Sequence, residues 1–363
     1  MRVLITVLDW GLGHATRCIP VIRELLVRGC IVSVAGNGDS LMLLKHDFPA
    51  LTYFDLPGYN PVYSSGGSMG VEMALQIPKF LNVINKEHRV IESLVQTESF
   101  DLIISDNRYG CWSEHAPSIF LTHQLSIQLP VKFRWLSRSV NRLQSRLINK
   151  FSACWIPDFP DTKSNLSGDL SKVDKALLTR TVNVGPLSRF NDVHEDVIKY
   201  DIVCILSGPE PQRSIFEEKV LSQLKESNFR YLVVRGLFKK MQEPLANTIT
   251  SLNSQDLHDV ICRSSVVLAR SGYSTIMDLV ALKKKAIVVP TPGQTEQEYL
   301  AKRFNERGIL LAMSQDDFNL EKAMNALGGF TGFKKIHEAS SGLLKNELDR
   351  LLTPKTLSTS YSK

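Results

Sequence analysis

Short apolar runs alternate with amphipathic stretches through the first half of the chain. Residues 3–8 are apolar and rich in β-branched side chains, as expected for a strand buried on both faces of a parallel sheet. A glycine turn follows, then an amphipathic helix over residues 16–28 that Gly29 is placed to end. Further strands are expected at residues 30–35, 51–54, 102–105 and 118–122. The alternation predicts an α/β domain built on a parallel sheet.

The same pattern starts again after residue 200. Each new apolar run is followed by a turn and a helical stretch, and the runs cover residues 202–206, 231–234, 266–269 and 286–289. The first of these helices is expected over residues 213–226, and an amphipathic helix over 335–352 closes the series. We therefore expect two Rossmann-like, doubly wound parallel-sheet domains facing across a cleft, with a boundary near residue 185. The domains are 1–185 and 186–352, and a flexible polar tail covers 353–363.

Composition narrows the class of protein. The chain has 363 residues, of which 43% are hydrophobic and 22% charged, enough to bury two cores. No apolar run approaches the roughly 20 residues that span a bilayer, and the first residues do not resemble a signal peptide. The six cysteines lie far apart without a C-x-x-C pair, which argues against a zinc site and a disulfide framework. We expect a cytoplasmic protein whose thiols are core residues.

A glycine turn with a histidine follows the first predicted strand. Its sequence, G-x-G-H-x-x-R, comprises Gly11, Gly13, His14 and Arg17. Ligands of open parallel sheets bind at the carboxyl ends of the strands, and glycines let the backbone approach a ligand closely. The turn lacks the third glycine of a dinucleotide motif and the lysine of a P-loop. His14 is the candidate general base for a hydroxyl, with a helix cap as the alternative, and Arg17 is either an acceptor-side residue or a solvated charge.

Three turns of the second domain carry polar side chains at the starts of helices. Ser207, Gly208 and Arg213 follow its first strand, where helix N–H groups accept phosphate. A later turn offers small donors to phosphate and then an acid to ribose hydroxyls: Arg270, Ser271, Gly272, Ser274, Thr275 and Asp278. The loop after the next strand carries amides and carboxylates suited to sugar hydroxyls: Gln294, Glu296, Gln297 and Glu298. A helix cap is the alternative for each residue alone, but three such turns together favour a nucleotide-sugar site.

Together these turns resemble the donor-binding pattern of glycosyltransferase family 28, the MurG-like enzymes of the GT-B fold. The pattern D-L-x12-R-S-G-x-x-T-x-x-D begins at Asp256, and P-x-x-x-Q-x-E-Q-x-Y-x-A begins at Pro290. The turn of the first domain is similar to the same family and to a related nucleotide-sugar hydrolase of pseudaminic acid biosynthesis. The fuller match from Asp9 to Arg17 resembles a bacterial and archaeal subgroup of glycosyltransferases.

The resemblance implies roles for the matching residues. Asp278 would bind the ribose, where the family usually has glutamate, and Gln297 and Glu298 would contact the donor sugar. Ser207 and Gly208 take the place of a glycine-rich turn, without the family's run of glycines. His14 matches an active-site histidine. The first domain would bind the acceptor and the second domain the nucleotide-sugar donor.

The activity implied is transfer of a sugar, N-acetylglucosamine or another hexose, from a UDP-sugar to an acceptor hydroxyl with inversion at the anomeric carbon. His14 would take the hydroxyl proton, and helix N-termini would stabilise the leaving diphosphate. Neither a cofactor nor a metal is expected, since the nucleotide sugar is a co-substrate and the sequence has no D-x-D motif. A nucleotide-sugar hydrolase or epimerase, and a non-catalytic nucleotide-sugar-binding subunit that recruits another enzyme, are the alternatives.

A basic amphipathic helix is expected over residues 132–151, inside a stretch without acids from 115 to 157. An apolar stripe runs along the helix beside six cations, whose number equals the net charge of +6. The cations are Lys132, Arg134, Arg138, Arg142, Arg146 and Lys150. Such helices lie on anionic membrane surfaces, so a lipid-linked acceptor of the cell envelope would account for this one. The alternative is a domain helix with solvated charges. No nucleic-acid-binding module accompanies the charge.

Two further polar residues follow predicted strands of the first domain. Asp106 comes after the strand at 102–105, and His123 comes after the strand at 118–122. Because the carboxyl ends of parallel strands meet at one edge of a sheet, both are expected near His14, as acceptor contacts or as its helpers. The aperiodic loop at 57–70 is a candidate for acceptor binding, since loops of this length are usually functional or mobile.

Overall fold

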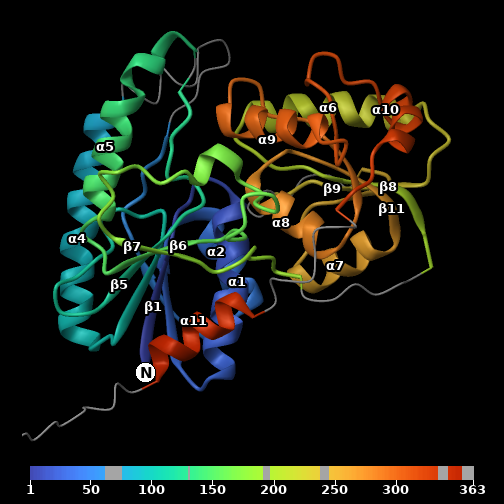
Figure 1. Cartoon of the computed structure of the whole chain (residues 1–363). Helices are drawn as coiled ribbons and strands as arrows, with labels where there is room; N and C mark the ends of the chain where they lie inside the picture. The colour runs from blue at the N-terminus through green and yellow to red at the C-terminus, as the bar shows by residue number, and fades with distance from the viewer. Residues whose placement is uncertain (62–75, 130, 191–196, 238–244, 334–341, 354–363) are drawn as a thin grey trace, which may run out of the picture.

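The computed structural model describes residues 1–61, 76–129, 131–190, 197–237, 245–333 and 342–353. Two parallel sheets, of seven and six strands, form the centres of two lobes (Figure 1). The strand orders are β3-β2-β1-β4-β5-β6-β7 and β10-β9-β8-β11-β12-β13. Each order reverses beside the first strand of its lobe, at the switch point where doubly wound folds bind ligands. The expected pair of Rossmann-like domains is confirmed.

Among the described residues, the first lobe has seven strands and the helices α1, α2, α4 and α5. The strands are β1 (Arg2–Val7), β2 (Ile31–Gly36), β3 (Thr52–Asp55), β4 (Leu102–Asp106), β5 (Ser118–Leu121), β6 (Ala153–Ile156) and β7 (Arg180–Asn183). The helices are α1 (Leu12–Val27), α2 (Gly38–Asp47), α4 (Ile77–Glu98) and α5 (Ser137–Ile148), with 3-10 turns η1 (Val131–Leu136) and η2 (Gly168–Ser171). Helices α2 and α4 and strands β6 and β7 were not predicted from the sequence. One helix was expected over 132–151, where the structure has η1 followed by α5.

Alternation along β1 distributes its side chains to the two faces of the sheet. Val3, Ile5 and Val7 lie in the apolar cluster that includes the buried face of α1, whereas Leu4 packs with Ile91 of α4. Each of these side chains is fully buried. A strand covered on both faces explains why residues 3–8 are continuously apolar rather than alternating.

The second lobe repeats this arrangement with shorter edge strands. Its strands are β8 (Tyr200–Ile205), β9 (Tyr231–Val234), β10 (Thr248–Ile249), β11 (Ser264–Ala269), β12 (Lys285–Val288) and β13 (Leu311–Ala312). Its helices are α6 (Gln212–Lys225), α7 (Ser254–Cys262), α8 (Tyr273–Ala281), α9 (Thr295–Glu306) and α10 (Leu320–Ala326), with the 3-10 turn η3 (Leu327–Gly329). α6 packs on one face of the sheet through Phe216, and α8 packs on the other through Ile276.

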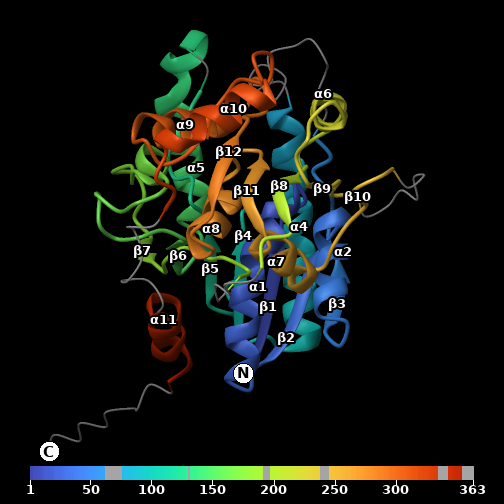
Figure 2. The same cartoon turned by 90° about the vertical axis from the view of Figure 1, so that its right-hand side faces the viewer.

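Helix α11 (Leu343–Leu352) returns to the first lobe, where it lies beside α1 (Figures 1 and 2). Arg28 Nε of the α1 end donates to Asp349 Oδ1 at 2.7 Å, and Lys345 pairs with Glu24 at 3.7 Å. Sequence analysis assigned residues 186–352 wholly to the second domain, and for α11 that assignment is wrong. Arg28 is 321 residues away from its partner in α11, and Arg180, which pairs with Glu347, is 167 residues away. An amphipathic pattern does not say which lobe will cover such a helix. The expected tail lies almost wholly outside the described residues.

The lobes are in direct contact at the ends of their strands. Ser274 Oγ donates to the Gly13 carbonyl at 2.7 Å, and Tyr273 Oη donates to the Pro157 carbonyl at 2.8 Å. Thr295 Oγ1 donates to the Gln128 carbonyl at 2.8 Å. One apolar cluster includes buried residues of both lobes. These contacts bring the switch points of the two sheets together.

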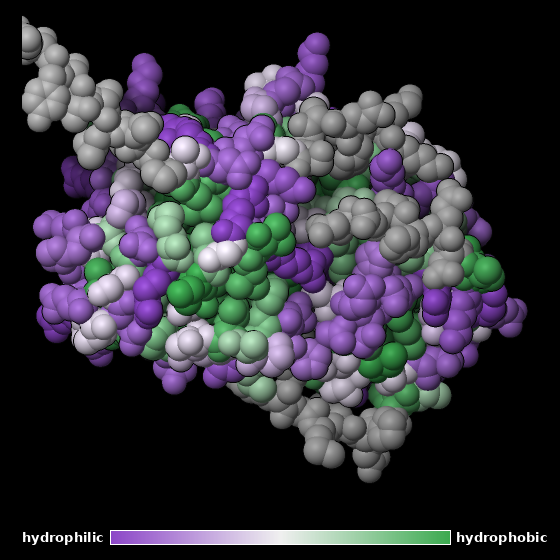
Figure 3. Space-filling view, turned by 90° about the horizontal axis from the view of Figure 1, so that it is seen from below, coloured by the Kyte–Doolittle hydropathy of each residue, from purple (hydrophilic) through white to green (hydrophobic). Residues whose placement is uncertain are grey.

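The opposite end of the first lobe, where β1 begins, is drawn in Figure 3 and shows apolar side chains gathered between polar ones. Val27 at the end of α1 is 82% exposed, and Ile31 at the start of β2 is 60% exposed.

Within the described part of the chain, no helix is both long enough and apolar enough to cross a membrane.

Candidate active site

The turn after β1 carries His14 into the first turn of α1. Gly11 precedes the helix with φ of 124°, a conformation that residues with a side chain rarely adopt. A Cβ on Gly13 would lie 2.9 Å from Ser274 Oγ of the other lobe, so this position has no room for a larger residue. The two glycines thus set His14 at the lobe boundary, where 15% of its side chain is exposed.

Asp106 and Arg17 hold the ring of His14. Asp106, the last residue of β4, is fully buried, and its Oδ2 lies 3.0 Å from His14 Nδ1. Arg17, one turn along α1, donates from Nε to Asp106 Oδ1 at 2.7 Å, and its Nη2 also pairs with that oxygen. Strands β1 and β4 are neighbours, with Val7 beside Asp106, which is why residues 92 positions apart meet. When Nδ1 donates to Asp106, Nε2 is left with a lone pair.

The electrostatics suit a neutral imidazole beside an ionised carboxylate. Burial is the main reason that the pKa of His14 lies below its ordinary value of 6.5; Asp106 opposes this and Arg17 adds to it. Burial alone would raise the pKa of Asp106, but Arg17 and His14 outweigh it and hold that pKa below its ordinary 3.8. His14 therefore has the charge state that a general base needs at neutral pH.

His123 joins the same group from the end of β5. Its Nδ1 lies 3.0 Å from Arg17 Nη1, and its Nε2 lies 3.1 Å from Glu296 Oε1 of the second lobe. The imidazole also stacks on Tyr273, with ring centroids 4.1 Å apart and an angle of 3°. The structure thus brings the predicted residues His14, Arg17, Asp106 and His123 together. Tyr273 was missed, because an aromatic residue at a helix start is usually a core residue.

The turn after β8 has the geometry of an anion cradle. Gly208 has φ of 113°, and the backbone then enters α6 at Gln212. The Thr291 hydroxyl is fully buried and has no hydrogen-bond partner in the described part of the chain. A Cβ on Gly208 would lie 3.6 Å from that hydroxyl, so Thr291 stands directly behind the turn. A backbone turn, a helix start and an unpaired hydroxyl are suited to phosphate oxygens.

The first turn of α8 supplies the second helix start of this region. Gly272 precedes α8 in an extended conformation, and Thr275 is half-buried in the first turn. Ser274 is also in this turn, but its hydroxyl donates to Gly13. Ser271, a predicted donor residue, is fully buried and donates to the Gln297 carbonyl at 2.8 Å.

Arg270 lies beneath the donor turns. Its side chain is fully buried and donates to the carbonyls of Val289, Pro290 and Gln212 at 2.9 to 3.2 Å, and to Gln315 Oε1 at 2.6 Å. Its guanidinium lies 4.1 Å from the Phe216 ring centroid. Burial lowers the pKa of Arg270 to about 10. Arg270 therefore ties the loops after β12 and before α6 together instead of presenting a charge to solvent.

The loop before α9 is braced by its own side chains. Gln297 Oε1 accepts from the backbone N–H of Thr291 at 2.8 Å, and Glu298 Oε1 accepts from that of Gly293 at 2.8 Å. Gln294 Oε1 is buried without a partner among the described residues. The two residues predicted to contact the donor sugar thus fix the loop, and a sugar contact by either remains a prediction.

Two other predicted donor residues have protein partners. Asp278 Oδ1 accepts from Ser188 Oγ at 2.8 Å, and Oδ2 accepts from Arg189 Nε at 3.2 Å, so the segment between the lobes occupies both oxygens. Burial raises the pKa of Asp278, and Arg189 opposes that rise. Arg213 pairs with Glu210 at 2.8 Å and with Glu217 at 3.1 Å. Their roles toward a nucleotide remain predictions.

Arg108 in the first lobe resembles Arg270 in the second. It is fully buried, pairs with Glu87 of α4 at 2.8 Å, and donates to the Val7 carbonyl and to Asn37 Oδ1 at 2.9 Å. Tyr59 Oη donates to the same Glu87 at 2.7 Å. This network was not predicted from the sequence, because no local pattern marks an ion pair between residues on different elements. The network joins the end of β1 at Val7 to the loops that follow β2 and β3, at Asn37 and Pro57.

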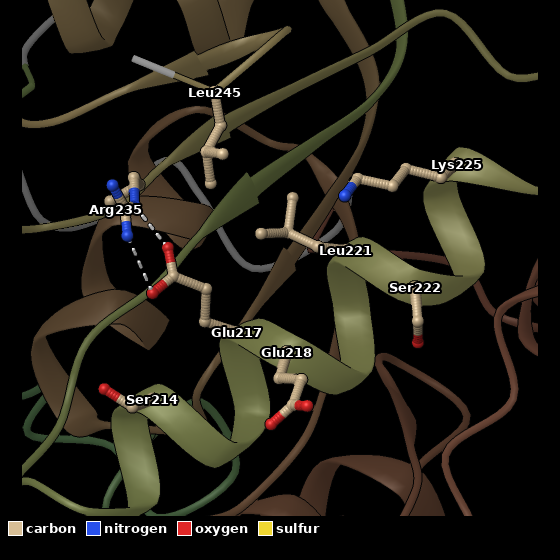
Figure 4. Close-up of a pocket in the computed structure, with 8 residues that line it drawn as sticks. All are labelled: Ser214, Glu217, Glu218, Leu221, Ser222, Lys225, Arg235 and Leu245. Carbon is tan, nitrogen blue, oxygen red and sulfur yellow. Dashed lines mark hydrogen bonds and ion pairs between the residues drawn. The ribbon is translucent and has the colours of Figure 1, made fainter. Parts of the chain in front are cut away.

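A pocket lies elsewhere in the second lobe. It has a volume of about 320 Å³ and lies between α6 and the residues Arg235 and Leu245, beside the Glu217–Arg235 pair (Figure 4). None of the predicted site residues lines it. No group of three or more His, Cys, Asp or Glu able to hold a metal ion occurs among the described residues.

The basic row of α5 is exposed, and its apolar stripe is only partly covered. Arg138, Arg142, Arg146 and Lys150 are all exposed. Leu143 is 37% exposed, and Ile77 and Leu81 of α4, which lies beside α5 in Figure 1, are also 37% exposed. The side chains of Lys132 and Arg134, and residues 62–70 of the predicted 57–70 loop, lie outside the described part of the chain.

The chain is similar in sequence to known glycosyltransferases. Residues 203–340 match the glycosyltransferase family 28 C-terminal domain. An uncharacterized glycosyltransferase of Methanosarcina acetivorans is 23% identical over 331 residues, covering 86% of this chain and 84% of that protein. The UDP-N-acetylglucosamine–N-acetylmuramyl-(pentapeptide) pyrophosphoryl-undecaprenol N-acetylglucosamine transferase of Natranaerobius thermophilus is 20% identical, covering 93% and 92% of the two chains.

Solved structures show the same architecture. The glycotransferase of kitacinnamycin superposes with a TM-score of 0.64 at 15% identity, covering 96% of this chain and 98% of that one. MurG of Acinetobacter baumannii superposes with a TM-score of 0.57 at 14% identity, covering 96% and 98%. The predicted GT-B fold and the resemblance to family 28 are confirmed.

Proposed function

We propose that this chain, a glycosyltransferase of the GT-B fold with a family 28 C-terminal domain, moves a hexose from a UDP-sugar to an acceptor hydroxyl with inversion. The observation that carries the proposal is the His14–Asp106 pair, which stands at the lobe boundary against the first turn of α8. A base on one lobe opposite helix starts on the other is the arrangement that an in-line displacement requires. The match to the family 28 donor domain supports a nucleotide-sugar donor, and a relative named for UDP-N-acetylglucosamine supports uridine and an N-acetylhexosamine.

The proposed step is a single displacement at the anomeric carbon. His14 Nε2 takes the proton of the acceptor hydroxyl while that oxygen forms the new bond to the anomeric carbon. The bond from this carbon to the diphosphate oxygen breaks, and the electron pair leaves with UDP. Asp106 stabilises the imidazolium that forms, since it is ionised and bonded to Nδ1. Attack opposite the leaving group inverts the configuration.

The leaving diphosphate is stabilised by the backbone. The N-terminus of α6 behind Gly208, the N-terminus of α8 at Gly272, and the Thr291 hydroxyl are the proposed donors to its oxygens. These groups supply charge stabilisation without a metal ion, and we propose that none is used.

The acceptor we propose is lipid-linked, and the enzyme works at an anionic membrane surface on the cytoplasmic side, in cell-envelope synthesis. The exposed cations of α5 and the exposed apolar side chains of α4 and α5 support this. Together they give a surface that suits lipid phosphate and the outer acyl region. The competing interpretation is that α5 is a solvated helix without a membrane role. Weaker binding to anionic liposomes after Arg138, Arg142 and Arg146 are replaced by Ser would favour the membrane role, and unchanged binding would favour the solvated helix.

One assay tests the proposed activity. Purified full-length protein is incubated with a panel of nucleotide sugars, with and without a lipid extract, and free nucleoside diphosphate, free sugar and sugar isomers are measured. The proposal predicts nucleoside diphosphate release that depends on the extract. Release without acceptor would establish a hydrolase, conversion to an isomer an epimerase, and binding without turnover a recruiting subunit; each of these contradicts transfer.

A further inference from the structure

A line of charged and polar side chains runs from the second lobe to His14. It starts at Glu296 in the first turn of α9 and continues through His123 and Arg17 to Asp106, which bonds His14. Only Glu296 belongs to the second lobe. The line therefore crosses the lobe boundary once, at the 3.1 Å contact of Glu296 Oε1 with His123 Nε2.

The contacts of His123 determine where its proton lies. A guanidinium can only donate hydrogen bonds, so the Nδ1 atom 3.0 Å from Arg17 Nη1 must accept. The proton is then on Nε2, which lies 3.1 Å from Glu296 Oε1; this is an ion-pair distance, but the two atoms do not have hydrogen-bond geometry. The Tyr273 ring, stacked at 4.1 Å, fixes the imidazole plane. Two of the three groups that hold His123 thus come from the second lobe.

His14 has two competing partners at one nitrogen. Its Nδ1 lies 3.0 Å from Asp106 Oδ2, an acceptor, and 2.8 Å from Arg17 Nη2, a donor. If Nδ1 donates to Asp106, Nε2 has the lone pair that a base needs. If Nδ1 accepts from Arg17, the proton lies on Nε2. The one lone pair of the neutral ring is then on Nδ1, where Arg17 occupies it, and none is left for the acceptor hydroxyl. The placement of Arg17 therefore decides whether His14 is a base.

We propose that Glu296 and His123 are positioning residues that select the base tautomer of His14 through Arg17. His123 holds Nη1 of Arg17, which keeps Nε and Nη2 of the guanidinium on Asp106 Oδ1. Asp106 Oδ2 then remains for the Nδ1 proton of His14. Because Glu296 holds His123 from the donor lobe, the base is completed only when the lobes meet. The inference rests on the proposed transfer function and adds its regulation by lobe contact.

A double-mutant cycle across the lobe boundary tests the coupling. Glu296→Ala and His123→Ala are each expected to lower kcat about 10- to 100-fold, the range for a small misplacement of reacting groups. The double variant should be no slower than the slower single one, since both changes release the same guanidinium. Glu296→Gln keeps an acceptor oxygen and should recover most of kcat. Glu306→Gln, on an exposed part of α9, is the matched control and should leave kcat unchanged.

Donor affinity separates positioning from direct contact. UDP titrated into each variant by calorimetry should bind as it does to the wild type. A direct contact of Glu296 with the donor sugar would instead raise the KM for the nucleotide sugar with kcat little changed. Additive losses in the cycle, or a change confined to KM, would overturn the inference.

A second readout does not depend on turnover. The full chain is labelled with ¹⁵N-histidine, and the spectra of His14→Ala and His123→Ala assign the two signals. His14 is expected to carry its proton on Nδ1 in the wild type and increasingly on Nε2 in Glu296→Ala. The same His14 tautomer in both proteins would refute the inference, even if the nucleotide-sugar assay succeeds. If no sugar transfer is found in that assay, the proposed function is wrong, and the spectra still test whether Glu296 changes the tautomer of His14.

Discussion

The hydroxyl of Ser274 donates to the carbonyl oxygen of Gly13 at 2.7 Å. This bond joins the first turn of α8, in one lobe, to the turn that carries His14 in the other. A side chain at position 13 would meet Ser274 Oγ at 2.9 Å and Ser274 Cβ at 3.2 Å. The contact therefore sets the distance between the proposed base and the helix start that faces it.

Gly13→Ala is expected to lower kcat about 10- to 100-fold, because its methyl group pushes α8 away from His14. Adding Ser274→Gly removes both clashing atoms and should restore much of the lost rate. The measurement is steady-state turnover of the nucleotide sugar by both proteins, with thermal unfolding as the check on folding. Wild-type kcat in Gly13→Ala would show that turnover does not depend on the distance between the Gly13 turn and α8.

The dependence of kcat/KM on pH should report the titration of His14. The pKa of His14 lies below 6.5, so His14 stays largely neutral at pH 6.5 and above. Activity should therefore drop only at a pH below 6.5, where His14 becomes protonated. Asp106 raises the pKa of His14, so Asp106→Asn should move the acid limb to lower pH while reducing kcat. An acid limb above pH 6.5 in the wild type, or one that moves upward in Asp106→Asn, would contradict this assignment.

Arg270→Lys is expected to destabilise the fold by about 3 kcal/mol, since four acceptors, two buried and two partly buried, lose the guanidinium that joins them. UDP affinity should fall as well, because the loops around the proposed cradle loosen. Urea unfolding and UDP calorimetry measure the two effects. Arg230→Lys, whose side chain is 59% exposed, is the control and should change stability by less than about 0.5 kcal/mol. Equal stability of the two variants would contradict the bracing role.

Replacing Arg138, Arg142 and Arg146 by Ser should weaken binding to anionic liposomes by about two orders of magnitude, at about 1 kcal/mol per cation. The control replaces Lys172, Lys175 and Lys322, which are exposed on other elements. Both proteins are tested by flotation with vesicles containing anionic lipid, at two salt concentrations. Unchanged flotation of the α5 variant would make α5 an ordinary solvated helix.

The strands that start the two lobes could be predicted, because burial on both faces makes them continuously apolar. β1 and β8 agree with the expected ranges to within two residues. The grouping of Asp106 and His123 around His14 also followed, since carboxyl ends of parallel strands share one edge. Helix α4 was not located; it carries Glu87 on its buried face, paired with Arg108, and this interrupts the apolar pattern.

The roles of single polar residues were harder to predict from the sequence. The sequence around Asp278 does not indicate that Ser188 and Arg189, about 90 positions earlier, bind both of its carboxylate oxygens. Arg270 stands in a ligand-binding motif, yet its side chain is directed into the protein. A motif gives the position of a turn in the fold, whereas the direction of each side chain depends on tertiary contacts.

His14→Ala is the most direct test of the account, with UDP binding and sugar transfer measured on the same protein. The account predicts that UDP binds as it does to the wild type, because the proposed cradle lies in the other lobe, while turnover falls at least about 100-fold with loss of the base. Undiminished turnover by His14→Ala would contradict the central claim that this histidine activates the acceptor.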